Sequence, residues 1–210
     1  MKKWIALLLA LALSAVLLGC EEAESFAGPE DAMAALNGQG TLTMHGDFES
    51  INQSSDLYVG GISAAHMEES GLFNIKWAVT IKGQDWFYVK YVTGEPVNNQ
   101  EGINSGVTLG FYDSNDTCLG YAQEQIVGDY GYLWIMLNPD FSPTGLWATE
   151  KGDALYDEAD NLLATGKTNF SYSSDLCDFT IDCVGGQDVP VFAKFAMYME
   201  LYNQAKTLHG

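Results

Sequence analysis

Hydrophobic and polar positions follow different periods in different parts of the chain. An apolar run from Trp4 to Leu18 follows two lysines, and residues 189–210 repeat apolar positions every three to four residues. Between them, from Gly40 onward, short segments rich in β-branched and aromatic residues are separated by Gly, Asn and Asp. This pattern predicts a mainly β protein that ends in an amphipathic helix.

A short helix is predicted before the first strand. Pro29, Glu30 and Asp31 favour a helix start, and Gly38 marks its end. Among the segments predicted as strands are 41–48, 57–63, 72–81 and 86–93, with a hairpin turn at residues 82–85.

The second half contains an internal repeat. The sequence FYDSNDTCLG at residues 111–120 matches LYDEADNLLA at residues 155–164, and a weaker match of 132–137 to 176–181 continues at the same offset. Two copies of a three-stranded unit would produce this repeat. A hairpin sequence that is favourable in itself, and was therefore used twice, would also produce it.

The two Tyr-Asp hairpins resemble those of FxLYD-type domains, which are small immunoglobulin-like modules of bacterial surface proteins. The resemblance implies an antiparallel, immunoglobulin-like β-sandwich and no activity. Such modules usually carry a glycine in the turn, where this chain has Thr117 and Asn161. We therefore expect a β-sandwich over residues 31–188, with two similar halves meeting near 94–105 and a helix at 189–210 packed on it.

The N-terminus has the order of an export signal: a basic start, an apolar stretch too short to span a bilayer, and a small residue before Cys20. Leu17-Leu18-Gly19-Cys20 resembles the bacterial lipobox, which implies removal of residues 1–19 and lipidation of Cys20. Two acyl chains contribute about 0.8 kcal/mol per buried methylene and anchor a protein stably. Residues 20–30 then form an acidic tether, and the protein lies on the extracytoplasmic face of a bacterial cell membrane.

Charge narrows the choice of partners. The formal net charge is −19, and removal of residues 1–19 leaves seven basic against 28 acidic residues, or −21. Nucleic-acid binding depends on basic residues that contact phosphates, so no nucleic-acid partner is expected. Beyond the membrane, contacted through Cys20, the partners expected are a glycan, a cell-wall component or an envelope protein.

The sequence contains no motif of a known catalytic or cofactor-binding type, so neither enzymatic activity nor a cofactor is predicted. Cys118, Cys177 and Cys183 are interpreted as free thiols, although Cys118 could pair with either of the others. Turn-forming acids are weak calcium candidates, and the same residues are explained by turn formation alone. These acids are Asp113, Asp116, Asp157 and Asp160.

Aromatic residues around the 82–85 turn supply the functional hypothesis. Strand alternation places Trp86, Tyr88 and Lys90 on one face, and these rings, with Trp77, are candidates for ligand binding or for the core. The expected function is non-catalytic binding. The alternatives are a secreted hydrolase that uses paired carboxylates and a scaffold that docks through its C-terminal helix.

Overall fold

The computed structural model describes residues 24–47, 54–71, 75–92, 105–126, 131–170 and 176–209. It contains the helices α2 (Pro29–Leu36) and α3 (Val191–His209). The strands are β1 (Leu42–Asp47), β2 (Ser54–Val59), β3 (Ile62–Ser70), β4 (Lys76–Ile81), β5 (Gln84–Tyr91), β6 (Ser105–Asp113), β7 (Cys118–Ile126), β8 (Tyr132–Leu137), β9 (Pro143–Thr149), β10 (Ala154–Tyr156), β11 (Leu162–Phe170) and β12 (Leu176–Cys183).

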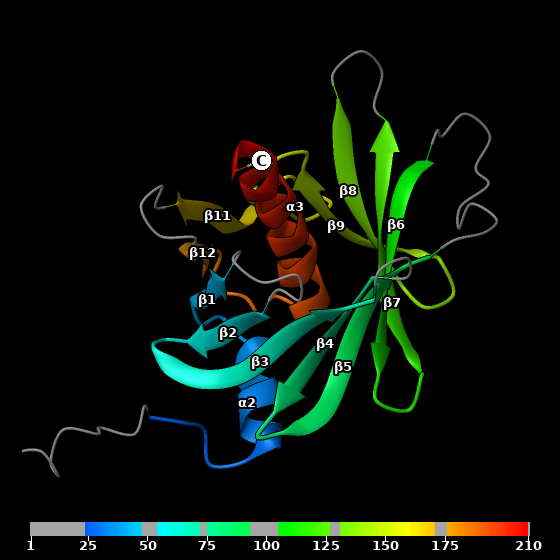
Figure 1. Ribbon diagram of the computed structural model, residues 1–210. Helices are drawn as coiled ribbons and strands as arrows, with labels where there is room; N and C mark the ends of the chain where they lie inside the picture. The colour runs from blue at the N-terminus through cyan, green and yellow to red at the C-terminus, as the bar shows by residue number, and fades with distance from the viewer. Residues whose placement is uncertain are drawn as a thin grey trace, which may run out of the picture.

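The strands form one closed antiparallel barrel, so the predicted β-sandwich is wrong (Figure 1). Each strand pairs with the next one along the chain, and β1 pairs with β12, with Leu42 opposite Ile181 and Asp47 opposite Leu176. This last pairing removes both free edges of the sheet. Alternation along a strand does not distinguish a barrel from a sandwich, because both bury one face of each strand.

Helix α3 lies inside the barrel instead of packing on an outer face (Figure 1). Its residues contact strands on opposite sides of the interior: Phe195 packs edge-on against Phe87 of β5, and Tyr198 packs edge-on against Phe179 of β12. All seven side chains from Ala193 to Met199 are at most 1% exposed, so this part of the helix is buried on every side. A barrel of this many strands is too wide for strand side chains alone to fill, and the helix occupies the remaining volume.

The N-terminal helix is confirmed, with α2 beginning at Pro29 after the N-cap Gly28. Of the predicted acidic tether, residues 20–30, the part from 20 to 23 lies outside the described residues. The described part lies against the barrel, and its last two residues, Pro29 and Glu30, belong to α2. The backbone N–H of Ser63 donates to the carbonyl of Glu24 at 2.9 Å, and Ser25 forms a parallel β-bridge with Ser63.

The predicted boundary near 94–105 falls almost entirely outside the described residues. The strands on either side of it, β5 and β6, pair directly, with Tyr88 opposite Tyr112, so both belong to the same barrel. Within the part of the chain that the structure describes, neither helix is both long and apolar enough to cross a membrane.

The two repeated hairpins have the same local structure. In both, an aspartate side chain accepts hydrogen bonds from backbone N–H groups two and four residues later: Asp113 in the first copy and Asp157 in the second. The turn residues Asp116 and Asp160 both have left-handed backbones, with φ of 64° and 60°. Both copies also shift register directly before the repeated tyrosine. The repeat is therefore structural, but its two hairpins, β6–β7 and β10–β11, belong to one barrel and are separated in it by β8 and β9.

Candidate functional site

The repeated tyrosines form two stacked aromatic pairs on the outside of the barrel. Tyr112 of β6 stacks on Tyr88 of β5, with ring centroids 5.2 Å apart and planes 16° apart. Tyr156 of β10 stacks on Trp147 of β9, at 4.5 Å and 19°. In each pair the two residues are directly opposite each other in the sheet. The residues before the two tyrosines, Phe111 and Leu155, are buried in the interior, which places the tyrosines outside.

The two pairs differ in how much ring surface they leave free. Trp147 and Tyr156 are both partly exposed, whereas Tyr88 is only 8% exposed. The Nζ of Lys76 lies 3.8 Å from the centroid of the Tyr88 ring, and the Nζ of Lys90 lies 4.5 Å from that of Tyr112. The Trp147–Tyr156 pair therefore offers the more open aromatic surface.

Tyr88 is held rigidly in its pair. Its hydroxyl donates to the Oδ1 of Asp116 at 2.8 Å. Burial, with this carboxylate as the second cause, raises the pKa of Tyr88 to about 12. A small pocket of about 80 Å³ adjoins the ring and is lined by Lys76, Asp85 and Asp116 among others. The phenol therefore stays neutral at physiological pH and acts as a fixed hydrogen-bond donor.

The structure separates the three aromatic residues that the sequence singled out. Trp77 lies in the barrel interior, 3% exposed, and packs edge-on against Tyr91. Trp86 is partly buried and packs against the core. Tyr88 is on the outer side of β5, since its neighbour Phe87 contacts the internal helix. Only Tyr88 of the three belongs to a stacked outer pair.

The four aspartates that were weak calcium candidates take part in the two hairpin turns. Backbone N–H groups, that of Thr117 first, lower the pKa of Asp113, and the Asn161 side chain is the main cause that lowers the pKa of Asp157. Asp116 and Asp160 occupy the left-handed turn positions. Among the residues that the structure describes, no group of three His, Cys, Asp or Glu side chains is arranged to hold a metal ion.

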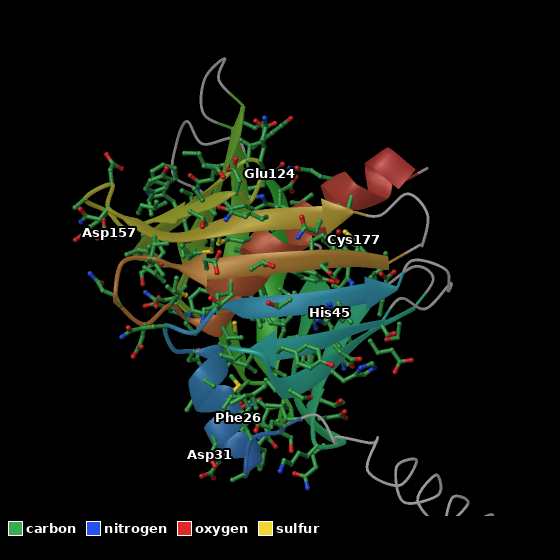
Figure 2. All side chains as sticks on the ribbon, turned by 90° about the vertical axis from the view of Figure 1, so that its left-hand side faces the viewer. Phe26, Asp31, His45, Glu124, Asp157 and Cys177 are labelled. Carbon is green, nitrogen blue, oxygen red and sulfur yellow. The ribbon has the colours of Figure 1, made fainter. Side chains whose placement is uncertain are left out.

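Two Asp–His pairs lie in one row across neighbouring strands, since Asp178 of β12 is opposite His45 of β1 and Asp56 of β2 is opposite His66 of β3. His45 is exposed on the outer face of the barrel (Figure 2). The Nδ1 of His45 donates to Asp178 at 2.6 Å, and the Nδ1 of His66 donates to Asp56 at 2.7 Å. His45 of β1 is also directly opposite Asp56 of β2. In the described part of the chain, no hydroxyl group is hydrogen-bonded to the Nε2 atom of either ring. The geometry therefore does not form a serine-type triad.

A hydrolase that uses paired carboxylates needs one carboxyl group with a raised pKa, and Glu200 of α3 has one. Burial, together with the charges of Glu124 and Glu150, raises its pKa. Neither the Lys76 pocket nor the larger hollow described below is lined by Glu200.

The three cysteines other than Cys20 are free thiols: Cys118, Cys177 and Cys183. Burial raises the pKa of Cys177 to about 12.

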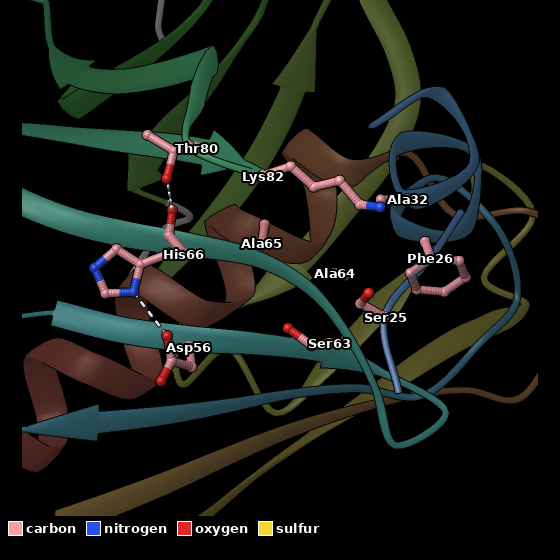
Figure 3. A pocket seen from close by; sticks show the side chains of 11 residues that line it. Ser25, Phe26, Ala32, Asp56, Ser63, Ala64, Ala65, His66, Thr80 and Lys82 are labelled. Atoms are coloured by element: carbon pink, nitrogen blue, oxygen red, sulfur yellow. Dashed lines mark hydrogen bonds and ion pairs between the residues drawn. The ribbon is translucent and has the colours of Figure 1, made fainter. Parts of the chain in front are cut away.

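A larger hollow of about 250 Å³ lies on the outer side of β3, under the N-terminal segment (Figure 3). Its floor is made of small side chains, including Ala64 and Ala65. The Asp56–His66 pair lies at one end, and Lys82 extends across the other end. The Nζ of Lys82 donates to the carbonyl of Ala27 at 2.9 Å, which joins the β4–β5 turn to the segment before α2.

No protein-family model, curated protein or solved structure matches this chain. The site is therefore defined by its geometry alone.

The sequence showed Tyr112 and Tyr156 as parts of a repeat but not as surface residues, and no sequence pattern indicated Trp147. The pattern that could have indicated the two tyrosines is an apolar residue, then a tyrosine, then an aspartate, which occurs in both copies of the repeat. If the apolar residue points into the interior, the tyrosine after it points outward.

Proposed function

We propose that this protein is a lipid-anchored, extracytoplasmic binding module of a bacterial envelope, without catalytic activity, whose outer aromatic pairs bind a glycan. The observation that carries the proposal is the stacked Trp147–Tyr156 pair, which leaves aromatic surface accessible on the outside of the barrel and recurs as Tyr88–Tyr112. Rings that are partly exposed in a polar setting offer an apolar face to a sugar ring.

Rigidity supports a binding role for these pairs. Each lies on paired strands of a closed barrel, and the two repeated tyrosines, Tyr112 and Tyr156, are each followed by an aspartate that fixes the turn. A preorganised surface loses little conformational entropy when a ligand binds. The proposal replaces Trp77 and Trp86 with Trp147, Tyr112 and Tyr156 as ligand-binding residues. Tyr88, which is only 8% exposed, supports the Tyr112 ring in its stacked pair.

The binding proposal is tested on a glycan array and by titration with solubilised cell-wall fragments. Trp147→Ala should abolish binding or weaken it about tenfold or more, since stacked aromatic contacts contribute about 0.5–1.5 kcal/mol beyond the area they bury. Tyr132→Ala is the matched control, because Tyr132 is 40% exposed and belongs to neither pair. Equal loss in both variants, or no binding by the parent protein, would contradict the proposal.

The anchor is tested separately. The export signal and the lipobox-like Leu17-Leu18-Gly19-Cys20 support lipidation of Cys20. Cys20→Ser should move the protein from the detergent phase to the aqueous phase in a phase-partition experiment on intact cells. Cys118→Ser, which removes a thiol elsewhere in the chain, should leave partitioning unchanged. If the Cys20 variant partitions like the parent, the protein is not anchored through this residue.

A further inference from the structure

We propose that the hollow on β3 is a second binding site, and that it takes a small zwitterion of about the size of a dipeptide, with its carboxylate toward Lys82 and its ammonium group toward Asp56. This site is separate from the aromatic pairs, which lie on β5, β6, β9 and β10. The proposal therefore does not depend on glycan binding.

The size of the hollow limits the ligand. Pockets that hold drug-sized molecules have volumes of about 300–1,000 Å³, so a hollow of about 250 Å³ suits a smaller one. Its lining follows β3 from Ser63 to His66, a rise of about 10 Å along the strand. An extended dipeptide spans about 7 Å between its ends, which leaves room for a charged partner at each end.

Charges of opposite sign lie at the two ends, and each is held in place by a neighbour (Figure 3). The His66 ring fixes Oδ1 of Asp56, and the second carboxylate oxygen remains able to accept a hydrogen bond. The carbonyl of Ala27 takes one proton of the Lys82 ammonium group, which has three. Lys82 and Asp56 are not paired with each other. Preorganised charges of this kind favour a ligand that carries both complementary groups.

The middle of the hollow suits the backbone and small side chains of such a ligand. Alanines 32, 64 and 65 and the partly buried ring of Phe26 provide apolar contacts. The hydroxyls of Ser25 and Ser63 line the same space, and in the described part of the chain neither makes a side-chain hydrogen bond within the protein. They are available to an amide group of the ligand.

The charge of the whole protein favours a zwitterion over a simple anion. With a formal net charge of −19, the molecule repels anions at long range. A zwitterion carries no net charge, so it approaches without this penalty and still uses Lys82. A simple cation would leave the ammonium group of Lys82 without an anionic partner.

The test is NMR titration of the full chain with alanylalanine, in both the L,L and the D,D form, following the backbone amides of Ala64 and Ala65. A ligand of this size should bind with a dissociation constant of about 1 mM. The N-acetylated form and the C-terminal amide should each bind about tenfold more weakly, because each removes one charge-assisted contact. Preference for the L,L form indicates ordinary peptides as the source, and preference for the D,D form indicates cell-wall peptides.

Two variants assign the ends of the ligand. Lys82→Gln should remove the preference for the free acid over the amide, and Asp56→Asn should remove the preference for the free amine over the acetylated form. The matched controls are Lys167→Gln and Asp178→Asn, since Lys167 is an exposed lysine on β11 and Asp178 makes the same kind of histidine pair outside the hollow. The proposal is overturned if neither dipeptide shifts the two amides at about 50 mM, if the blocked forms bind equally well, or if the controls change the preferences equally.

Discussion

The ammonium group of Lys194, on the internal helix, donates a hydrogen bond of 2.8 Å to the carbonyl of Leu36, the last residue of α2. A second hydrogen bond, of 2.6 Å, goes to the carbonyl of Gly38. Lys194 is fully buried, and burial lowers its pKa. A cation at the C-terminal end of a helix also interacts favourably with the helix dipole. This one side chain therefore connects the helix inside the barrel to the short helix at its end.

Replacing Lys194 with Met tests this connection. Met fills a similar volume but leaves the carbonyls of Leu36 and Gly38 without this donor, and each buried unsatisfied group costs about 1–3 kcal/mol. We expect Lys194→Met to lower the free energy of unfolding by about 2 kcal/mol in urea titrations and to speed amide exchange in α2. Lys167→Met, on the exposed surface, should change stability by less than about 0.5 kcal/mol. Similar values for the two variants would show that the hydrogen bonds of Lys194 do not stabilise the fold.

Tyr88 should make the protein less stable in alkaline solution. Its pKa is raised to about 12 in the folded state, from 10.0 for a free phenol. The unfolded chain therefore loses this proton first, so the contribution of Tyr88 is complete below pH 10 and is lost as the pH rises toward 12. Tyr88→Phe is expected to be less stable than the parent at neutral pH, because it lacks the hydrogen bond to Asp116. The difference in free energy of unfolding between the parent and Tyr88→Phe, measured in denaturant titrations, should decrease as the pH rises from 10 to about 12.

Asp116→Asn is the matched variant for the Tyr88 experiment. Asparagine tolerates the left-handed backbone of position 116, where φ is 64°. The change removes the charge that disfavours the tyrosinate and keeps the burial that is the larger cause of the raised pKa. Its alkaline loss of stability should therefore lie between those of the parent and Tyr88→Phe. A parent protein whose stability relative to Tyr88→Phe stays constant from pH 9 to about 12 would contradict the raised pKa.

The two copies of the repeat should respond alike to the loss of their turn aspartates. The pKa values of Asp113 and Asp157 are both lowered by hydrogen bonds to the carboxylate. The stabilisation from each is present above the ordinary pKa of 3.8 and is lost as the pH falls through the lower folded-state value. Asp113→Ala and Asp157→Ala are expected to destabilise the protein at pH 7 by similar amounts, and the difference from the parent should shrink in acid.

A third turn, outside the repeat, provides a further comparison. Phe141 has a left-handed backbone, with φ of 66°, and Asn138 and Ser142 make the same backbone hydrogen bonds as the repeated turns. The side chain of Asp140, not of the first turn residue, accepts the hydrogen bonds from Ser142, which lower its pKa. Asp140→Ala should therefore show the same direction of pH dependence. Unequal behaviour of Asp113 and Asp157 would mean that the two hairpins differ energetically despite their matching geometry.

The sequence predicted local structure more reliably than the arrangement of the strands. The hairpin turn after β4, the helix at Pro29 and the hairpins at Asp113 and Asp157 depend on neighbouring residues, and the structure contains all of them. The predicted turn at 82–85 is only shorter, because Gln84 and Asp85 already pair as part of β5. Closure of the barrel depends on pairing between β1 and β12, which are separated by most of the chain and carry no local signal of partnership. The outward direction of Trp147 depends in turn on which face of β9 meets the interior.

The same limit explains the error about α3. Val191, Phe195, Tyr198 and Tyr202 form a stripe at helical spacing, which predicts one buried face. The flanking positions, including Phe192 and Met199, are also apolar, and a helix that is apolar all round is buried on every side. The apolar composition of residues 191–199 on several faces was therefore the available signal for an enclosed position.

Deleting residues 189–210 tests whether α3 is an internal helix of the core or an external helix that docks on a partner. A helix that docked outside would leave the strands folded and remove only the contact with a partner. Here Phe195, Tyr198 and Tyr202 fill the interior, and the hydroxyl of Tyr202 donates to the buried carboxylate of Glu69 at 3.0 Å. We therefore expect the truncated chain to lose cooperative unfolding, as followed by circular dichroism and tryptophan fluorescence. Phe195→Ala, a milder change in the full chain, should cost about 3–5 kcal/mol, whereas Phe141→Ala, on the outer surface, should cost far less. A truncated chain that melts like the parent would place the helix outside the core.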